Sequence, residues 1–381
     1  MRVLHISDIH AGKLTYGISR NKDLEYSLNE VLRISKENRV NYIIMSGDIF
    51  DRKNPDNTAI EIINEFLVRL KELGIAAIMI GGNHDNFDYL KALKPFGRLT
   101  NLFIVDRPKK NLSEAIVELE NLCVACLPYP SPDILTEIGE DISKRERKYA
   151  ELISQYFSAL EYYTREKRPR ILMSHIFISG AKLGGGELSS SVSPEFSVPA
   201  YCIPYGFDYV ALGHLHKFQE VEGANSPTYY SGSLYQMDFG ESQDSKFVIL
   251  AEFKNYSPHV EEIEIPVLRN LVSIKLSLEE INDQLFEKFN SSDLYKITLK
   301  VKQDEKFTKQ VDELKKRLGE RLILNLELEK PTKRLENLEY RDKSLESLYE
   351  LYLKENRMSE NEISKYLKTF REIIINEANN S

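Results

Sequence analysis

Residues 210–217 read VALGHLHK, a run of buried-type residues that ends in a glycine and two histidines. Side chains two apart on an extended chain point to the same side, so His214 and His216 face one way while Leu215 turns back. Taken alone, the stretch fits either a buried strand end that happens to contain histidine or one edge of a metal site.

Four other strand-like runs end in the same manner: RVLHIS (2–7), VNYIIMSG (40–47), IAAIMIGG (75–82) and RILMSH (170–175). The polar residues at or just after these ends are, in chain order, Asp8, His10, Asp48, Asp51, Asn83, His84, Asp85 and His175. With His214 and His216, five of the seven histidines occupy strand ends, which scattered surface histidines would not do.

Helical periodicity separates the first strands. Apolar residues recur at helical spacing over 24–36, which predicts a helix there. The same spacing from Ala59 to Leu70 predicts a second helix, which Gly74 ends. A third, charged helix is expected at about 143–167. Alternating strands and helices predict an α/β fold, with a largely parallel sheet that helices cover on both faces. Ligands bind beyond the carboxyl ends of such strands, where the polar residues fall.

The pattern restarts after Pro266. Strands at 271–277, 294–301 and 321–329, with helices at 279–289 and 304–318, predict a small α/β unit. The expected organisation is 1–266 as the main domain, 267–328 as the small domain, 329–342 as a charged linker and 343–381 as a helical pair. The last helix carries one apolar stripe (Ile363, Tyr366, Leu367, Phe370, Ile373, Ile374), which needs a surface, either on its own globular domain or on a partner.

Composition narrows the class of protein. The net charge of −8 argues against coating nucleic acid or membrane by bulk attraction, although local basic residues could complete a nucleic-acid surface. Candidates for that surface are Lys13, Arg20, Arg52, Lys53, Lys217 and 165–170. Cys123, Cys126 and Cys202 are expected to pack structurally rather than bind zinc. No signal peptide or membrane-spanning run is found, which predicts a cytoplasmic protein.

Seven of the strand-end residues would make a shared site with five histidine or amide ligands and two carboxylates, one of which, Asp48, is placed to bridge; they are Asp8, His10, Asp48, Asn83, His175, His214 and His216. That balance suits two ions of Mn, Fe or Zn better than Mg or Ca. Two such ions stabilise the attacking and leaving oxygens of displacement at phosphorus, so phosphoester hydrolysis is the reaction expected. His84 would remain free to titrate and to protonate a leaving alkoxide.

The motifs SDIH, SGDIFD, GGNHD, SH and GHLH, in that order, resemble the calcineurin-like metallophosphoesterase family, whose fold is a β-sandwich flanked by helices with a dinuclear centre. The length, YSGS at 230–233, the small α/β unit and the helical tail narrow the resemblance to the Mre-eleven/SbcD family of DNA double-strand-break repair nucleases, in an archaeal form.

The resemblance implies two Mn²⁺ ions, one bound by Asp8, His10 and His216 and the other by Asn83, His175 and His214, with Asp48 bridging and His84 as the catalytic histidine. Many relatives carry histidine where this chain has Asp51, which leaves that position to orient a neighbouring ligand.

The family further implies a 3′→5′ exonuclease on double-stranded DNA and a single-strand endonuclease, acting in the cytoplasm near the nucleoid and not on a membrane. Residues 267–328 would be a DNA-binding capping domain. The C-terminal helices would bind the coiled coil of a Rad-fifty-type, SMC-like ABC ATPase, and a homodimer would form a heterotetramer with it. A phosphoesterase for small phosphodiesters and a DNA-end-binding scaffold with weak catalysis are the alternatives.

Overall fold

The structure is a computed structural model that describes residues 1–132, 142–184, 196–254, 256–301, 307–328, 344–355 and 358–378. The chain divides into two compact units, Met1–Leu328 and Glu329–Ser381. The first unit contains the five strand ends that the sequence singles out.

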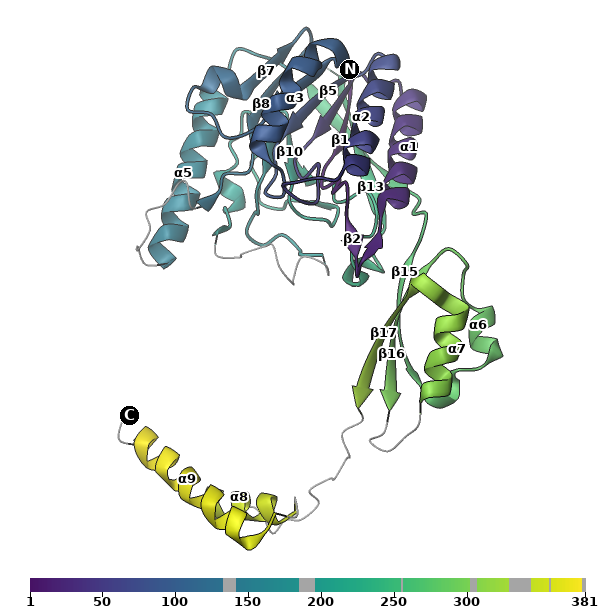
Figure 1. The fold of residues 1–381 in the computed structure, drawn as a ribbon. Helices are drawn as coiled ribbons and strands as arrows, with labels where there is room; N and C mark the ends of the chain where they lie inside the picture. The colour runs from purple at the N-terminus through teal and green to yellow at the C-terminus, as the bar shows by residue number, and fades with distance from the viewer. Residues whose placement is uncertain are drawn as a thin grey trace. The chain divides into compact units, whose positions relative to one another are not determined.

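Two six-stranded sheets form the main body of the first unit (Figure 1). The first sheet has the order β14-β13-β1-β4-β5-β6, and its strands are β1 (Arg2–Ile6), β4 (Tyr42–Met45), β5 (Ala76–Ile80), β6 (Leu102–Val105), β13 (Lys246–Lys254) and β14 (Ser257–Ile265). Strands β1, β4, β5 and β6 run parallel, while β13 pairs antiparallel with both β1 and β14. The predicted first three strands are confirmed, whereas β6 and β14 were not predicted.

The second sheet has the order β11-β12-β10-β9-β8-β7. Its strands are β7 (Ile116–Leu119), β8 (Leu122–Leu127), β9 (Arg170–His175), β10 (Tyr209–Gly213), β11 (Gln219–Glu220) and β12 (Thr228–Tyr230). Strands β8, β9, β10 and β12 run parallel, so β9 and β10 end side by side, with His175 paired to Gly213 in register. This pairing brings two of the predicted strand ends together.

The sheets pack face to face, which corrects the expectation of one sheet with helices on both faces. Ile44 joins the core between the sheets, whereas its neighbour Ile43 faces the other way, into the core beneath the helices of the first sheet. These helices are α1 (Asn21–Glu37), α2 (Asn57–Glu72) and α3 (Phe87–Thr100), and α5 (Ile142–Tyr163) covers the outer face of the second sheet. The β-sandwich flanked by helices, which the resemblance implies, is confirmed.

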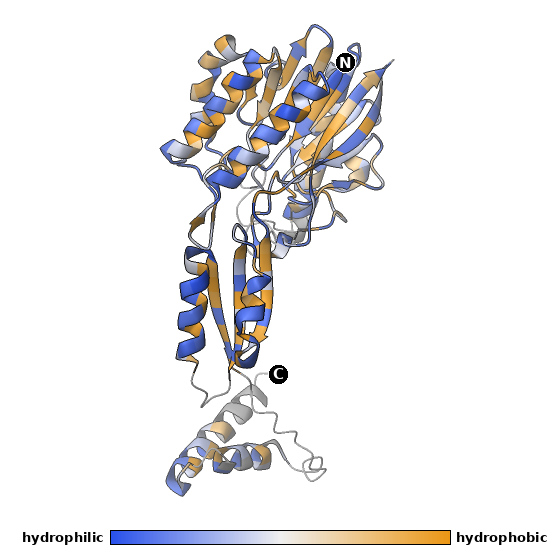
Figure 2. Ribbon diagram, turned by 90° about the vertical axis from the view of Figure 1, so that its right-hand side faces the viewer, coloured by the Kyte–Doolittle hydropathy of each residue, from blue (hydrophilic) through white to orange (hydrophobic). Residues whose placement is uncertain are grey.

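Hydropathy follows these layers. In Figure 2 the strands are largely apolar, while the helices alternate apolar and polar residues around their axes. All three cysteines are free, and Cys126 packs in the core between the sheets, in keeping with a structural role. The sandwich thus holds its strands rigidly from both sides.

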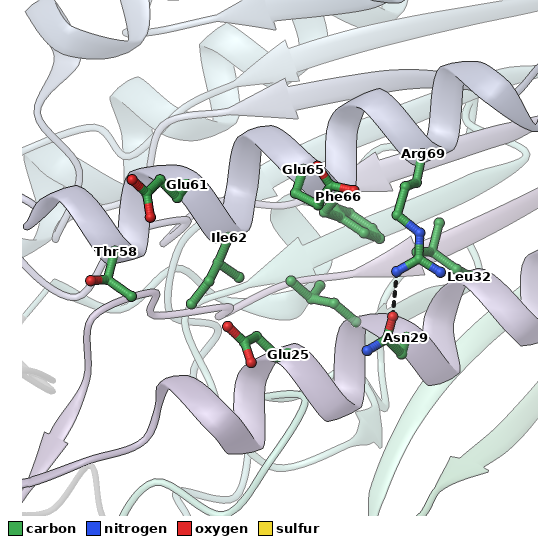
Figure 3. A pocket seen from close by; sticks show the side chains of 10 residues that line it. Glu25, Asn29, Leu32, Thr58, Glu61, Ile62, Glu65, Phe66 and Arg69 are labelled. Atoms are coloured by element: carbon green, nitrogen blue, oxygen red, sulfur yellow. Dashed lines mark hydrogen bonds between the residues drawn. The ribbon is translucent and has the colours of Figure 1, made fainter.

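A groove of about 300 Å³ lies between α1 and α2 (Figure 3). Its floor contains buried apolar side chains such as Leu28 and Phe66, and Glu25, Glu61 and Glu65 line it above them. The three carboxylates outnumber the one arginine of the lining, Arg69, so the groove disfavours a phosphate backbone.

The three-stranded sheet has parallel strands β15 (Leu271–Ser277), β16 (Leu294–Val301) and β17 (Leu322–Leu328), with α6 (Asp283–Glu287) and α7 (Thr308–Leu318) after the first two. The predicted helix at 279–289 is wrong in extent. Ser277 and Glu280 cap a single 3-10 turn, and Asn282 then starts a separate short helix by accepting the backbone N–H of Leu285. Residues 304–306 of the other predicted helix, at 304–318, lie outside the described residues.

The second unit contains α8 (Leu345–Glu355) and α9 (Glu360–Ala378). The rings of Tyr349 and Phe370 stack with centroids 4.6 Å apart, and Leu353 and Ile363 are buried. Ile373 and Ile374 of the predicted stripe belong to α9, but their side chains lie outside what the structure describes, and so does the predicted linker at 329–342. Among the described residues, no helix is long and apolar enough to cross a bilayer.

Candidate metal centre

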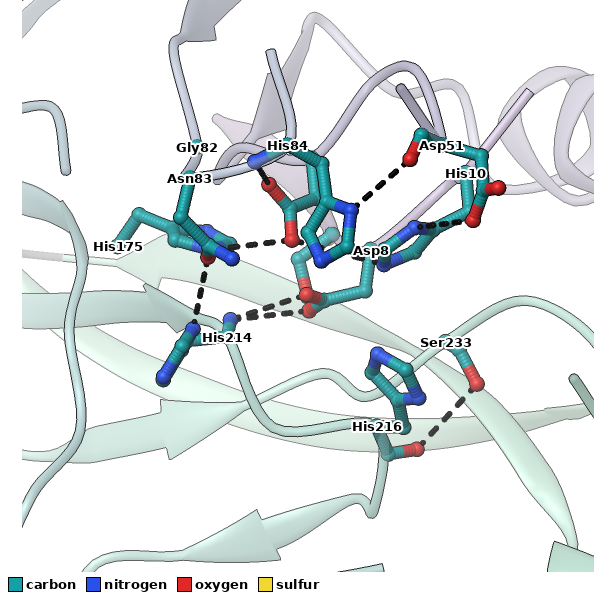
Figure 4. A network of polar contacts seen from close by, with 12 residues as sticks. Asp8, His10, Asp51, Gly82, Asn83, His84, His175, His214, His216 and Ser233 are labelled. Carbon is teal, nitrogen blue, oxygen red and sulfur yellow. Dashed lines mark hydrogen bonds and ion pairs between the residues drawn. The ribbon is translucent and has the colours of Figure 1, made fainter. Parts of the chain in front are cut away.

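All eight predicted site residues lie together at the carboxyl ends of the strands (Figure 4). Loops after β1, β4 and β5 supply the residues from the first sheet, and β9 and the loop after β10 supply those from the second. The full set is Asp8, His10, Asp48, Asn83, His84, His175, His214 and His216. The site therefore lies where the edges of both sheets meet.

The backbone of these loops is strained. Asp8, His10, Asp48 and His214 have φ values of 49°, 45°, 52° and 103°, in the region that side-chain-bearing residues rarely adopt. Such conformations cost roughly 1–3 kcal/mol each and persist where the surroundings enforce them. Here the enforcement comes from paired loops, because Ile9 and His10 both donate backbone N–H groups to the carbonyl of Asp48, at 2.8 and 2.9 Å.

Two glycines allow this close approach. Gly47 has a φ of 92°, and a Cβ there would lie 2.4 Å from Nδ1 of His175. A Cβ on Gly82 would lie 2.1 Å from the Asp48 carboxylate. A larger residue at either position would displace a predicted ligand.

Asp8, His10 and His216 form one cluster of ligand atoms. One atom from each lies within 4.8 Å of the others, and the rings of His10 and His216 are 5.1 Å apart. Asp8 and His10 are buried. This is the set predicted for the first ion.

Asn83, His175 and His214 form a second cluster beside it. The Asn83 side-chain oxygen lies 3.0 Å from both Nε2 of His175 and Nδ1 of His214. Asp48 lies between the clusters, because its Oδ2 is 3.5 Å from Nε2 of His10 and 3.3 Å from Nε2 of His175. This is the position required of a bridging ligand.

His84 lies at the edge of the centre and is half-buried. Its backbone N–H donates to Asp48 Oδ1 at 2.9 Å, and its ring Nδ1 lies 2.9 Å from the carbonyl oxygen of Asp51. Its ring is 4.8 Å from that of His10. The side chain is thus held beside the candidate ligands.

Burial and neighbouring charges shift the pKa values of Asp8 and Asp48 in opposite directions. Burial raises the pKa of Asp8 to about 6. Burial also opposes the charged form of Asp48, but the neighbouring histidines, His175 first, bring its pKa well below the ordinary value. Asp48 is therefore charged over the whole neutral range, whereas Asp8 holds its charge weakly.

The pKa values of the histidines are also shifted in opposite directions. Burial lowers the pKa of His10 to about 4 and that of His214 to about 3, so both rings are neutral and able to bind a cation. Burial would also lower the pKa of His175, but Asp48 raises it to about 9. A proton on His175 thus supplies the positive charge that Asp48 requires, and a bound cation would replace it.

The residues present fit a pair of divalent ions. Among the described residues, neither ring nitrogen of buried His10 has a hydrogen-bond partner, although both lie near carboxylates. Buried polar atoms are rarely left unsatisfied without a ligand or a water. A donor set rich in nitrogen suits transition metals.

Two residues that support the centre, Glu241 and Asp85, were not among the predicted site residues, although Asp85 is one of the polar strand-end residues. Glu241 is fully buried and lies 2.9 Å from Nδ1 of His216, and although burial opposes its charge, Lys246 and His216 lower its pKa well below the ordinary range. Asp85 accepts the backbone N–H groups of Gly82, Ile49 and Phe50, and so ties the Asn83 loop to the Asp48 loop. The motif GGNHD contained the signal for Asp85, whereas nothing near position 241 marked the glutamate.

Two other positions bear on the predictions. Asp51 Oδ1 lies 3.3 Å from Nδ1 of His10 and 3.0 Å from Lys13 Nζ, as an orienting residue would. Arg20, by contrast, is wrong as a surface candidate for nucleic acid, because it is fully buried and paired with Asp23.

Comparisons with known proteins identify the family of the chain. The profile of the calcineurin-like phosphoesterase family matches residues 1–218. The D subunit of the nuclease SbcCD from Bacillus subtilis is 33% identical over 260 residues, which are 67% of this chain and 66% of that protein. The proteins of the same name in Escherichia coli K12 and Staphylococcus epidermidis are each 27% identical, over 75% and 78% of this chain and 73% and 79% of their own lengths.

Among solved structures, a dimetal phosphatase from Danio rerio matches with a TM-score of 0.46 and 11% identity, over 69% of this chain and 95% of that one. The chain spans about two thirds to four fifths of the three curated relatives. The family profile covers more than half of the chain, from the first strand to the loop that carries His216. This chain therefore belongs to the calcineurin-like phosphoesterase family, whose members use divalent metals.

Proposed function

We propose that the chain is a Mn²⁺-dependent DNA nuclease that processes double-strand ends, as a 3′→5′ exonuclease on duplex DNA and an endonuclease on single strands. The observation that carries the proposal is the convergence of seven ligand side chains at five strand ends, in a chain similar to nuclease subunits. Phosphodiester hydrolysis is the reaction that this donor set serves.

Two Mn²⁺ ions would be held by the two clusters, with Asp8, His10 and His216 on one ion, Asn83, His175 and His214 on the other, and Asp48 on both. When bound, such a pair supplies Lewis-acid stabilisation of the phosphate oxygens and a nucleophile at neutral pH. The chain itself contributes the orientation, because the strained loops fix the ligands.

His84 is the residue we assign to proton transfer. If its Nδ1–H donates to the carbonyl of Asp51, its Nε2 remains for the substrate. A histidine in this position delivers a proton to the leaving alkoxide of the cleaved phosphodiester. Its half-buried place keeps the ring both fixed and reachable.

Residues 267–328 would act as the DNA-binding capping domain. One face of its sheet packs under α6 and α7, and the residues that alternate with that face include Lys275, Lys296 and Lys300. Lys296 Nζ lies 2.7 Å from the hydroxyl of Tyr16, in the loop between β2 (Leu14–Thr15) and β3 (Ile18–Ser19) just after His10. The lysines suit contacts with phosphates. Through Tyr16, Lys296 adjoins the loop that follows the candidate ligand His10.

Helices α8 and α9 would bind the coiled coil of an SMC-like ABC ATPase. Although the two helices pack on each other, Tyr352 and Tyr366 are 60% and 45% exposed. Exposed rings on a helical pair suit helix-in-groove recognition.

A homodimer would present two such centres and assemble with the ATPase as a heterotetramer. Phe96 and Leu99 on α3 are 60% and 65% exposed, and Phe103 on the adjacent β6 is also exposed. An apolar patch of this kind is typical of a protein interface.

The test is cleavage of end-labelled duplex and single-stranded DNA by the purified chain, with Mn²⁺ or with a chelator. We expect Mn²⁺-dependent shortening from 3′ ends and internal cuts in single strands. Efficient hydrolysis of a small chromogenic phosphodiester without DNA cleavage would establish the small-substrate alternative. DNA binding without any hydrolysis would establish the scaffold.

A further inference from the structure

A buried ion pair lies directly behind His216. Lys246 Nζ is 2.7 Å from Glu241 Oε2, and Glu241 and Lys246 are 0% and 1% exposed. Glu241 ends the 3-10 turn Phe239–Glu241, and Lys246 begins β13. The pair therefore lies at the start of a strand of the first sheet, whereas His216 lies in the loop after β10 of the second sheet.

The other carboxylate oxygen faces the histidine. Glu241 Oε1 lies 2.9 Å from Nδ1 of His216. An ionised carboxylate only accepts hydrogen bonds, so Nδ1 carries the proton and donates it. The lone pair is then on Nε2, the ring nitrogen used for a metal in this tautomer.

The glutamate is itself held in place. Its Oε2 accepts the backbone N–H of Met237 at 3.1 Å and the Ser233 hydroxyl at 3.4 Å, and Lys246 also donates to Ser233 at 2.8 Å. Ser233 and His216 contact each other as well (Figure 4). Every polar atom of the carboxylate is thus engaged, and one of its bonds goes to His216.

Stability alone does not account for this arrangement. A buried ion pair contributes little to stability compared with apolar residues of the same volume, because desolvation offsets the attraction. The partners at Nδ1 differ among the candidate ligand histidines, since His175 Nδ1 lies 2.7 Å from the backbone carbonyl of Ser46 and His10 Nδ1 lies 3.3 Å from the partly exposed Asp51 carboxylate, whereas the carboxylate at His216 is fully buried and paired with a buried lysine. A bond from a fully buried carboxylate to a candidate ligand fits a role in the metal centre.

We propose that Glu241, neutralised by Lys246, is a positioning residue that fixes the tautomer and the ring direction of His216 towards the cation shared with Asp8 and His10. This inference rests on the proposed metal centre. It assigns a part of the centre to the segment 231–246, beyond the ligand motifs. Partners of this kind typically raise metal affinity about 10- to 100-fold.

Two double variants isolate the hydrogen bond. Glu241→Gln with Lys246→Met removes both charges and keeps an acceptor oxygen for His216, whereas Glu241→Met with Lys246→Met removes both charges and the acceptor. The two proteins have similar side-chain volumes and no uncompensated buried charge, so both should fold. Circular dichroism and urea unfolding of the metal-free proteins check that their stabilities match.

The first measurement is Mn²⁺ binding to metal-free protein by calorimetry. We expect the Gln/Met variant to keep two sites close to wild-type affinity, and the Met/Met variant to lose about 10- to 100-fold at one site alone. Equal affinities in the two variants, at equal stability, would overturn the proposal.

The second measurement needs no metal. In ¹⁵N-histidine spectra of the metal-free protein, His216 should show the Nδ1–H tautomer in wild type and in the Gln/Met variant, and a mixture of tautomers in the Met/Met variant. An unchanged His216 signal in all three would contradict the positioning role. Failure of wild type to bind Mn²⁺, with the tautomer change present, would instead count against the proposed function and leave the role of Glu241 intact.

Discussion

The Asp8 carboxylate accepts the backbone N–H of His214 at 3.1 Å, across 206 residues of sequence. Asp8 follows β1 in the first sheet and His214 follows β10 in the second, so this bond joins the two halves of the sandwich at the metal centre. It also fixes the predicted ligands of two different ions relative to each other.

Replacing Asp8 by Asn should stabilise the metal-free protein at pH 7 while weakening Mn²⁺ binding. The folded pKa of Asp8, about 6, lies above the ordinary value of 3.8, so its contribution to stability is fully present below pH 4 and is lost as pH rises through 6. Removing the charge should therefore raise the free energy of unfolding at pH 7 by about 3 kcal/mol. Urea unfolding with a chelator at pH 5 and pH 7 measures this.

Asp48→Asn is the matched control, because the shift has the opposite sign. The folded pKa of Asp48 is below the ordinary value, so its stabilising contribution exists above pH 4 and is lost on acidification. This variant should destabilise the metal-free protein at pH 7. Changes of the same sign in both variants would contradict the opposite pKa shifts of the two carboxyl groups.

His84→Ala should reduce DNA hydrolysis about 10²- to 10⁴-fold while leaving the number of bound Mn²⁺ ions unchanged. The His84 contact with Asp48 uses the backbone N–H, which alanine retains. Steady-state cleavage and metal analysis measure the two effects. His259→Ala, at a histidine on β14 far from the centre in sequence, should leave both at wild-type levels, and full activity of His84→Ala would remove the assigned role.

Gly82→Ala should abolish Mn²⁺ binding at the Asp48 position and destabilise the fold by about 1–3 kcal/mol. A Cβ at Gly82 would overlap the Asp48 carboxylate and meet its backbone nitrogen at 2.3 Å. Gly180→Ala is the control, since a Cβ there meets nothing within 4 Å, although its φ of 86° adds strain. Calorimetric metal titration separates the variants, and normal binding by Gly82→Ala would refute the steric argument.

Leu99→Glu combined with Phe96→Glu should convert the proposed homodimer into a monomer. Both side chains are exposed on α3, and a carboxylate in an apolar interface opposes association. Light scattering after size exclusion gives the mass. Tyr205→Glu changes a tyrosine that is 80% exposed elsewhere and should leave the mass as it is.

Deletion of residues 340–381 should remove binding of the ATPase and spare Mn²⁺-dependent cleavage. The second unit begins at Glu329, and the candidate metal centre lies wholly within the first unit. Pull-down with the ATPase and cleavage of end-labelled DNA measure the two outcomes. Loss of both would mean that the helices stabilise their own globular unit.

The grouping of the candidate ligands at one edge was predictable because strand ends are visible in sequence. A run such as VALG (210–213) marks a buried strand, and the carboxyl ends of parallel strands meet at one edge, so the order of residues alone could group His175 with His214. Glu241 could not be found in this way. It reaches His216 from 25 residues away, and one glutamate among 59 acidic residues carries no periodic signal.

The layering of the fold was harder to predict from the sequence. Ile43 and Ile44 are both fully buried, and a strand buried on both faces has the same pattern whether a helix or a second sheet covers it. The residues alone therefore favoured helices on both faces, and the resemblance to a known family supplied the sandwich. The short α6 shows the same limit on a smaller scale, because a capping asparagine, Asn282, interrupts the expected helix and starts a new one.

The order of β13, β1 and β4 in the first sheet has a consequence for synthesis of the protein. β1 leads into Asp8 and His10, yet one of its two neighbours is β13, which is completed only at Lys254. The second sheet likewise waits for β10 before His214 and His216 can join. Until β10 and β13 have formed, Asp8, His10 and Asp48 therefore lack the candidate ligands that follow the second sheet, and the candidate centre is complete only when the sandwich closes. The proposed cleavage activity would therefore depend on completed folding of both sheets.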